Sequence, residues 1–465
     1  MNRTKKLFSN IAVFIVGNLG SKLISFLMVP LYTYYLTSGQ FGTIDLLLTT
    51  INLCLPLVTL SLFDAVFRFT MDKRIDSGEV LSTGFFSTIL FSGVSLLFFP
   101  LVKMFNVPHV GLFFLILFFT AIFTMFQNFT RAFGYSRVFA TSGIINTFIF
   151  ASVNIVLLVF FHGGVEAYLE SYLIAIIVSI VYLVLKVKIW NKIKVNQYSY
   201  GLLKSMLHYS VPLIPNSLAW WFTNDSSRYF ILAFVGVSAN GMFAVANKIP
   251  TIINMFFTIF TQAWQISAID EFESRDSSEY YSKVFRNLLQ FLFILVGVLI
   301  LVLKPGMRIL FSLSYYDAWH YVPILLISVV FADISAFLGT VYLAAKKTIS
   351  VFSTTVCGMI VNVTLSALLT PILGVYGAGV SMVVGFFVVI LLRLHSIKKF
   401  VRIVMPWGKF ASLIFSLSVM LVGVYSPNND FIGVAITILG FVFMLVMNRD
   451  FLGDVMVVFQ SIKKK

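Results

Sequence analysis

Long apolar segments follow one another along the whole chain, separated by short polar connections. Fourteen of them are long enough to cross a bilayer as helices, which takes about 20 mostly apolar residues. They lie at 11–36, 41–63, 81–102, 110–130, 138–161, 166–187, 207–235, 241–266, 285–303, 320–343, 349–370, 376–394, 407–425 and 430–447. The pattern predicts an all-α polytopic membrane protein with about 14 transmembrane helices. The connections are too short to house a folded domain, so we expect the functional side chains within the helices or at their ends.

Composition and charge support this class and suggest an orientation. The chain is 59% hydrophobic and 11% charged, whereas soluble domains are about 25% charged. If the N-terminus is cytoplasmic, 27 of the 33 Lys and Arg residues fall in cytoplasmic connections or span ends, and the outer segments hold only Lys103, Lys304 and Arg308. This asymmetry follows the positive-inside rule. We therefore expect both termini in the cytoplasm, and the net charge of +15 does not indicate nucleic-acid binding.

Two short matches indicate an internal repeat. An Asn followed fourteen residues later by a Tyr occurs at Asn154–Tyr168 and again at Asn362–Tyr376. The stretch YYLTSGQFGTI resembles AFVGVSANGMF and pairs Gly42 with Gly241. The two offsets, 208 and 199 residues, agree within the variation of loop lengths. The repeat predicts two six-helix lobes followed by two additional helices, at residues 1–190, 200–400 and 406–447.

Asp225 and Arg228 lie within the seventh apolar segment, where each charge costs about 2.5–3.5 kcal/mol at a bilayer centre. They are three residues apart, so they share a helix face and can pair. One hypothesis is that Arg228 binds an anionic group of a substrate, while Asp225 holds the arginine or takes up a coupling proton or cation. The alternative is an ion pair that is purely structural.

Other charges within the apolar segments are further candidates. Lys22 and Lys248 lie in the first and eighth segments. Either could contact an anionic headgroup, or could extend to the membrane surface or pair with a carboxylate such as Asp45. Asp333 is a lone carboxylate in the tenth segment and is a second candidate for coupling to H+ or Na+.

Asp64 and Arg68 are four residues apart at the inner end of the second segment and also share a helix face. They could form an interfacial pair that anchors the helix end, or an inner gate where a headgroup enters. Pro30 and Pro250 could each kink a span. Four aromatic residues could stack on sugars, although we favour a position at the membrane interface for most of them; they are Trp220, Trp221, Tyr229 and Trp264.

The sequence gives no sign of catalysis. It lacks a Gly-rich phosphate-binding loop ending in Lys and Ser or Thr. The five histidines are scattered, without a metal-ligand spacing. We therefore expect no catalytic residue, no metal site and no bound cofactor. Energy would come from an ion gradient or from consumption of a transported product.

Four stretches carry a resemblance to a known family. They are GNLGSKLISFLMVPLYTYYLTSGQFGTIDLLLTT at 17–50, LSLFDAVFRF at 60–69, YSVPLIPNSLAWWFTNDSSRYFILAFVGVSANGMFAVANKIP at 209–250 and TQAWQISAIDEFESRDSSEYYSKVF at 261–285. The chain resembles the polysaccharide transporters of the multidrug, oligosaccharidyl-lipid and polysaccharide exporter superfamily. That family usually places Asp directly beside Arg, whereas two serines separate Asp225 from Arg228 here.

The resemblance implies a V-shaped bundle that alternates between inward-open and outward-open states. It would flip an undecaprenyl-diphosphate-linked oligosaccharide repeat unit of capsule, O-antigen or exopolysaccharide across a bacterial cytoplasmic membrane. A cavity between the lobes would contain Lys22, Arg228 and Lys248. A polysaccharide polymerase and a chain-length regulator are implied partners. A lipid II flippase and a cation-coupled drug antiporter remain alternatives; a membrane polymerase or ligase is disfavoured because no sizeable outer loop is present.

Overall fold

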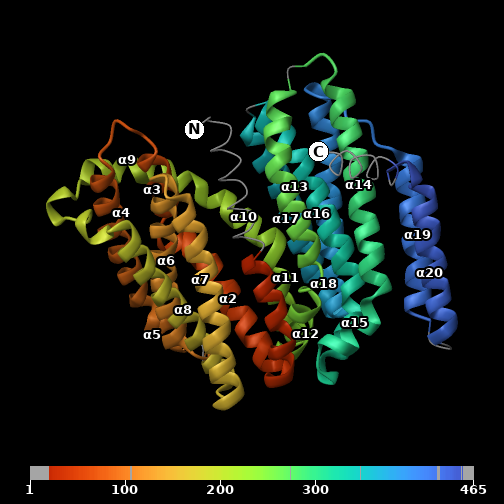
Figure 1. Cartoon of the computed structure of the whole chain (residues 1–465), viewed down its shortest axis with the longest axis horizontal. Coiled ribbons are helices and arrows are strands. Elements are labelled where there is room, and N and C mark those ends of the chain that lie inside the picture. Colours follow the sequence, from red (N-terminus) through yellow and green to blue (C-terminus); the bar gives the residue numbers. More distant parts are fainter. Residues whose placement is uncertain are drawn as a thin grey trace, which may run out of the picture. The chain divides into compact units, whose positions relative to one another are not determined.

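The computed structural model describes residues 20–104, 107–272, 274–345, 347–426, 430–451 and 453. Throughout these residues the regular structure is helical, without a β-strand, as the apolar pattern predicts. The chain forms two compact units (Figure 1). The first runs to Tyr229 and includes Val237–Gly241, and the second comprises Phe230–Gly236 and the chain from Met242 onward.

The described part of the first unit starts with a helix at residues 20–35. The helices that follow are α2 (Ser38–Val58), α3 (Leu62–Thr70), α4 (Ser77–Ser95), α5 (Phe99–Met104), α6 (Val110–Ala132), α7 (Ser136–Ile155), α8 (Gly164–Val187), α9 (Tyr200–Ser210), α10 (Ile214–Asp225) and α11 (Ser227–Phe234, which ends in the second unit). A π-helical segment, η2 (Val156–Phe160), extends α7. The unit extends past the predicted lobe boundary at 190 because α9 packs on α3 and α4, and α10 packs on α2.

Local signals fix where these helices begin. Thr37 and Gln40 form a reciprocal capping box at the start of α2, which satisfies backbone N–H groups that have no partner inside the helix. The Asp76 side chain caps α4 by accepting from the N–H of Gly78. The apolar faces of α3, α4, α6 and α9 meet around Val66, Met125 and Met206, none of which is exposed to solvent.

The second unit contains helices of similar length. They are α12 (Val237–Ala246, which starts in the first unit), α13 (Thr251–Asp270), α14 (Ser277–Leu301), α15 (Leu303–Leu310), η6 (Leu313–Tyr321), α16 (Val322–Ala344), α17 (Thr348–Leu373), α18 (Val375–Ser396), α19 (Trp407–Val424) and α20 (Asp430–Met447). Its centre is aromatic: the ring of Phe337 stacks on Trp264 at 4.9 Å and on Phe285 at 5.5 Å, measured between ring centroids.

Ten helices within the described residues are long and apolar enough to span a membrane, or eleven if one bent pair counts as a span. They match ten of the fourteen predicted segments. The predicted eighth segment is the bent pair, in which α12 and α13 meet at 49°. The turn between them ends at Pro250, where a kink was predicted. The fourteenth is the shorter apolar helix α20. The described residues therefore show a multi-pass membrane protein, but they do not reproduce the predicted count of fourteen spans.

The predicted seventh segment, 207–235, is not one helix. It is divided among α9, α10 and α11, and the last break falls at Ser226, between Asp225 and Arg228. The prolines Pro212 and Pro215 stand at the earlier breaks, where their missing N–H groups cannot continue a helix. The first predicted segment, 11–36, lies partly outside the described residues.

Candidate functional site: a buried arginine between two carboxylates

The side chains of Asp45, Asp225, Arg228 and Asn240 meet inside the first unit and are called the Arg228 cluster below. They come from α2, from the C-terminus of α10, from α11 and from the first turns of α12. Residues 195 positions apart in sequence thus form one polar site within an apolar helical bundle.

Arg228 bridges the two carboxylates. Its Nε donates to Asp45 Oδ2 at 2.7 Å, and its Nη1 donates to Asp225 Oδ1 at 2.6 Å. The guanidinium side chain is 11% exposed, Asp45 15% and Asp225 33%. The pair predicted from the three-residue spacing is therefore confirmed, and Asp45 is an additional partner. Charge-assisted hydrogen bonds of this length are the strong ones.

A close contact between two glycines places Asn240 beside Asp45. A Cβ on Gly42 would lie 2.1 Å from the carbonyl oxygen of Val237, and a Cβ on Gly241 would lie 1.8 Å from the carbonyl oxygen of Ser38. Only glycine allows the α2 and α12 backbones to approach this closely. Asn240 Nδ2 then donates to the carbonyl oxygen of Gly42 at 3.2 Å and to Asp45 Oδ2 at 3.4 Å.

Aromatic side chains support the cluster from α10 and α11. The indole of Trp221 donates to the carbonyl oxygen of Thr49 at 3.0 Å. The hydroxyl of Thr50 donates to the carbonyl oxygen of Leu46 at 2.6 Å, so the Tyr229 hydroxyl is the donor in its hydrogen bond with Thr50. These bonds fix α10 and α11 against α2 one turn from Asp45.

The cluster carries a net formal charge of −1 when both carboxylates are ionised, because one guanidinium faces two of them. Two further oxygens on its elements are buried without a hydrogen-bond partner among the described residues, namely Asn240 Oδ1 and Ser227 Oγ. Uptake of one proton or one monovalent cation would neutralise the cluster. Oxygen atoms are also the ligands that hard cations such as Na+ prefer.

The remaining predicted cations are less buried. Lys22 is exposed on the helix at 20–35. Lys248 lies in the turn of the bent pair α12–α13, and its side chain is half-buried. Asp45 was predicted as a partner for these lysines, and it pairs with Arg228 instead.

Asp333 is buried in α16 of the second unit, 4% exposed. Its Oδ2 has no hydrogen-bond partner among the described residues. A buried carboxylate in this state is costly when charged, so it favours a bound proton or cation.

One prediction is wrong. Asp64 and Arg68 form no ion pair, although both lie on α3 within the described residues and the i,i+4 spacing permits one. Arg68 is exposed while Asp64 is half-buried. Trp221 and Trp264 are 8% and 4% exposed, and their position at the membrane interface stays a prediction. Trp264 Nε1 donates to the Thr340 hydroxyl at 2.9 Å, so both indoles are packing groups inside their units.

A second buried arginine was missed. Arg393 on α18 is 1% exposed. Its guanidinium donates to the hydroxyls of Thr354 and Thr355 at 3.1 and 3.0 Å and to the carbonyl oxygen of Ser335 at 2.5 Å. The sequence showed only a basic residue at a cytoplasmic span end, which is where the positive-inside rule expects one. No signal in the sequence distinguished it from its exposed neighbours.

The described residues contain no group of three His, Cys, Asp or Glu side chains arranged to hold a metal ion. The candidate site is thus an ion-paired cluster in a helical bundle.

Comparisons with solved structures agree with this architecture. A structure titled "Lipid II flippase MurJ, inward closed conformation" is similar with a TM-score of 0.73 at 14% identity, over 96% of this chain and 100% of the other. A mutant of the Vibrio cholerae MATE transporter VcmN gives 0.58 at 15% identity, over 85% of this chain and 97% of the other. An inward-facing multidrug resistance MATE family transporter of the MOP superfamily gives 0.59 at 12% identity, over 85% and 94%. At these identities the likeness shows the fold, which is that of membrane transporters and flippases.

No curated protein matches the chain. The family model described as "Polysaccharide biosynthesis protein" matches residues 7–265, which is more than half of the sequence. The chain therefore belongs to the polysaccharide biosynthesis protein family, and it is a multi-pass membrane protein with a transporter fold.

Proposed function

We propose that the protein flips an undecaprenyl-diphosphate-linked oligosaccharide from the inner to the outer leaflet of a bacterial cytoplasmic membrane. The Arg228 cluster is the observation that supports the proposal most directly, because its guanidinium is held between two carboxylates within a helical bundle. The chain's membership of the polysaccharide biosynthesis protein family points to the class of substrate. A hydrophilic oligosaccharide and a diphosphate cannot cross hydrocarbon unaided. They require a protein that supplies charge inside the membrane and changes conformation.

The cluster suggests how charge and conformation are coupled. Asp225 is the most exposed member of the ion triad, at 33%, and it stands at the break between α10 and α11. A proton or Na+ that binds Asp225 removes its attraction for Arg228 Nη1. The guanidinium then keeps Asp45 through Nε, and Nη1 becomes available to a phosphate oxygen, for which arginine is well shaped. Lys22 and Lys248 are proposed to contact the same anionic headgroup.

Asp333 is proposed as a second coupling carboxylate, because it is buried with an unsatisfied oxygen. Asp64 and Arg68 are proposed to act at an inner gate, or where a headgroup enters, without forming an ion pair with each other. We place both termini in the cytoplasm, and a polysaccharide polymerase and a chain-length regulator remain proposed partners.

A lipid II flippase is the second candidate. The MurJ structure matches 96% of this chain, whereas the two MATE structures match 85%. Lipid II also carries a polyprenyl diphosphate, so the same cationic groups would serve. A drug antiporter is third, since its cationic substrates would be repelled by Lys22 and Lys248.

The test uses bacterial cells that lack their own repeat-unit flippase but still make the lipid-linked precursor. The wild type, Asp225→Asn and Arg228→Ala are expressed at matched membrane levels, and precursor retained on the inner leaflet is quantified. We expect the wild type to clear the precursor and both variants to retain most of it. Asp276→Asn is the matched control, because Asp276 is exposed and makes no side-chain capping bond.

Three outcomes would redirect the proposal. Clearance by all variants would leave the flippase function standing and make the cluster structural. Failure of the wild type on several precursors, with rescue of cells depleted of their lipid II flippase, would establish the second candidate. Failure in both strains, with protection against cationic drugs, would establish the antiporter.

A further inference from the structure

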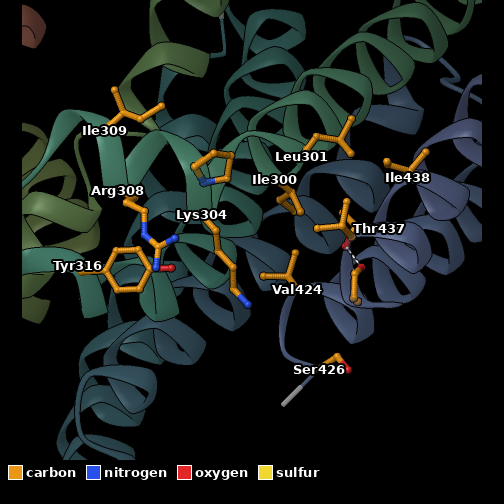
Figure 2. A pocket seen from close by; sticks show the side chains of 14 residues that line it. Ile300, Leu301, Lys304, Arg308, Ile309, Tyr316, Val424, Ser426, Thr437 and Ile438 are labelled. Carbon is orange, nitrogen blue, oxygen red and sulfur yellow. Dashed lines mark hydrogen bonds between the residues drawn. The ribbon is translucent and has the colours of Figure 1, made fainter. Parts of the chain in front are cut away.

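A pocket of about 480 Å³ lies in the second unit, between α14, α15 and η6 on one side and the α19–α20 hairpin on the other. Figure 2 shows Lys304, Arg308 and Tyr316 on one wall, and Val424, Thr437 and Ile438 on the opposite wall. This volume is within the range of small-molecule sites. The pocket is far along the chain from the Arg228 cluster and shares no residue with it.

One end of the pocket is cationic. Lys304 and Arg308 are one turn apart on α15, so their like charges repel each other. Lys304 Nζ lies 4.6 Å from the centre of the Trp319 ring, and Arg308 Cζ lies 6.0 Å from the centre of the Tyr316 ring. Among the side chains that the structure describes, neither cation forms an ion pair. An anion between them would offset the repulsion.

The rest of the pocket is mainly apolar. Ile300, Leu301, Val434 and Ile438 line it, and Val434 and Ile438 are 56% and 47% exposed. The hairpin pairs the candidate span α19 with the shorter apolar helix α20, so its exposed aliphatic side chains are suited to face lipid. The pocket therefore opens toward acyl chains and not only toward water.

Close packing between α19 and α20 fixes the position of the apolar wall. A Cβ on Gly423 would lie 2.6 Å from the carbonyl oxygen of Gly433, and a Cβ on Gly433 would lie 2.6 Å from that of Gly423. The two helices meet at these glycines, and Thr437 donates to the carbonyl oxygen of Gly433 at 2.8 Å. At the other side, the Tyr425 hydroxyl donates to the carbonyl oxygen of His320 at 2.5 Å, which ties α19 to η6.

The charge distribution argues for a ligand here. Only Lys103, Lys304 and Arg308 fall in segments that the topology prediction assigns to the outer face, and two of these three line this pocket. Basic residues on the outer face are contrary to the positive-inside bias. Two of them gathered beside an apolar wall match the chemistry of a phosphate joined to acyl chains.

We propose that this pocket binds an anionic glycerophospholipid of the outer leaflet. Its phosphodiester lies between Lys304 and Arg308, and its acyl chains lie along Val434 and Ile438. A zwitterionic lipid is disfavoured, because its ammonium group would meet two cations. Free phosphate would leave the apolar wall unused. The inference concerns a lipid site in the membrane protein and does not depend on the transported substrate.

Lipid binding by the purified full chain tests the proposal. Native mass spectrometry would measure binding of dioleoylphosphatidylglycerol, dioleoylphosphatidylethanolamine, glycerol 3-phosphate and undecaprenyl phosphate. We expect phosphatidylglycerol to bind best, and the double substitution Lys304→Gln and Arg308→Gln to weaken its binding at least about tenfold. Val434→Phe should also weaken phosphatidylglycerol binding, because the larger side chain narrows the pocket along its apolar wall. The control Lys103→Gln, in another predicted outer segment, should leave the binding unchanged.

Several results would overturn the proposal. They are unchanged phosphatidylglycerol binding in both the charge variant and Val434→Phe, equal binding of phosphatidylethanolamine, or an equal loss in Lys103→Gln. Binding of glycerol 3-phosphate as strong as that of the lipid would make this a phosphate site. Tighter binding of undecaprenyl phosphate would assign the pocket to the isoprenoid carrier.

Discussion

Replacing Gly241 by alanine tests the contact that organises the Arg228 cluster. The added Cβ would lie 1.8 Å from the carbonyl oxygen of Ser38, and ordinary contacts begin at 3.4 Å. The α2 and α12 backbones would therefore have to separate by about 1.6 Å. The obstructing atom belongs to the backbone, so no side-chain rotation can relieve the clash.

The separation has a calculable cost. Overpacking costs about 1–3 kcal/mol in well-packed interiors. The movement would also stretch the Asn240 bonds to Asp45 and Gly42, now 3.4 and 3.2 Å, and each such bond contributes about 1 kcal/mol. The better helix propensity of alanine returns up to about 1 kcal/mol. We expect a net loss of about 3 kcal/mol, or a fall in melting temperature on the order of 5 °C.

The assay is thermal unfolding of the purified protein in detergent, followed by intrinsic tryptophan fluorescence. Gly93→Ala is the matched control, since it is also a helical glycine and a Cβ there would meet nothing within 4 Å. The control should unfold at or slightly above the wild-type temperature. If Gly241→Ala unfolds together with the wild type or with Gly93→Ala, the reasoning about this contact is wrong.

Three further predictions follow from named contacts. Arg228→Lys should fail in transport, because an ammonium lacks the fork that reaches Asp45 and Asp225 from one position; precursor accumulation measures this, and activity equal to the exposed control Arg402→Lys would contradict it. Arg393→Met keeps the aliphatic stem but removes the charge-assisted hydrogen bonds to Thr354, Thr355 and Ser335, so it should destabilise the protein by about 2–3 kcal/mol in thermal unfolding. The Arg74 guanidinium holds the pKa of Asp72 well below its usual range. A depressed pKa stabilises the folded state above the unfolded value of about 3.9 and loses that contribution as the pH falls. Asp72→Asn should therefore lower the melting temperature at pH 7 by more than it does as the pH drops below 4, and a pH-independent difference would refute the ion pair.

Sequence reasoning predicted the parts of the fold that depend on local pattern. The apolar segments anticipated ten spanning helices and the bent pair at Pro250. The three-residue spacing anticipated the Asp225–Arg228 pair. Local sequence patterns could not identify Asp45 as the second partner of Arg228. That contact depends on two backbone segments, 199 residues apart in sequence, that meet at Gly42 and Gly241. The match between YYLTSGQFGTI and AFVGVSANGMF related these glycines without indicating that they touch.

The glycine contact is reciprocal. Gly42 meets Val237 and Gly241 meets Ser38, and both pairs are related by the same offset of 199 residues. Equivalent positions that exchange contacts in this way are typical of a two-fold relation. The wider two-lobe repeat stays a prediction, while this local contact gives it a concrete point to test.

Sequence reasoning was wrong, or gave no signal, where the same residue type occurs in both exposed and buried environments. The i,i+4 spacing of Asp64 and Arg68 permits an ion pair, yet no pair forms because Arg68 is exposed while Asp64 is half-buried. Trp221 and Trp264 find hydrogen-bond acceptors inside the bundle and are buried, which no local pattern in the sequence indicated. Arg393 is at a span end, where exposure is the rule, and the hydroxyls that allow its burial come from another helix.

The central claim is that the protein flips a lipid-linked oligosaccharide. The most direct measurement uses liposomes that contain the purified protein and a fluorescent undecaprenyl-diphosphate-linked oligosaccharide, with an impermeant quencher added outside. The account predicts that wild-type protein, but not Asp225→Asn, exposes nearly all of the fluorescent lipid, and that fluorescent phosphatidylcholine stays protected in the inner leaflet. Protection of the oligosaccharide lipid equal to that in protein-free liposomes, or equal exposure of phosphatidylcholine, would contradict it.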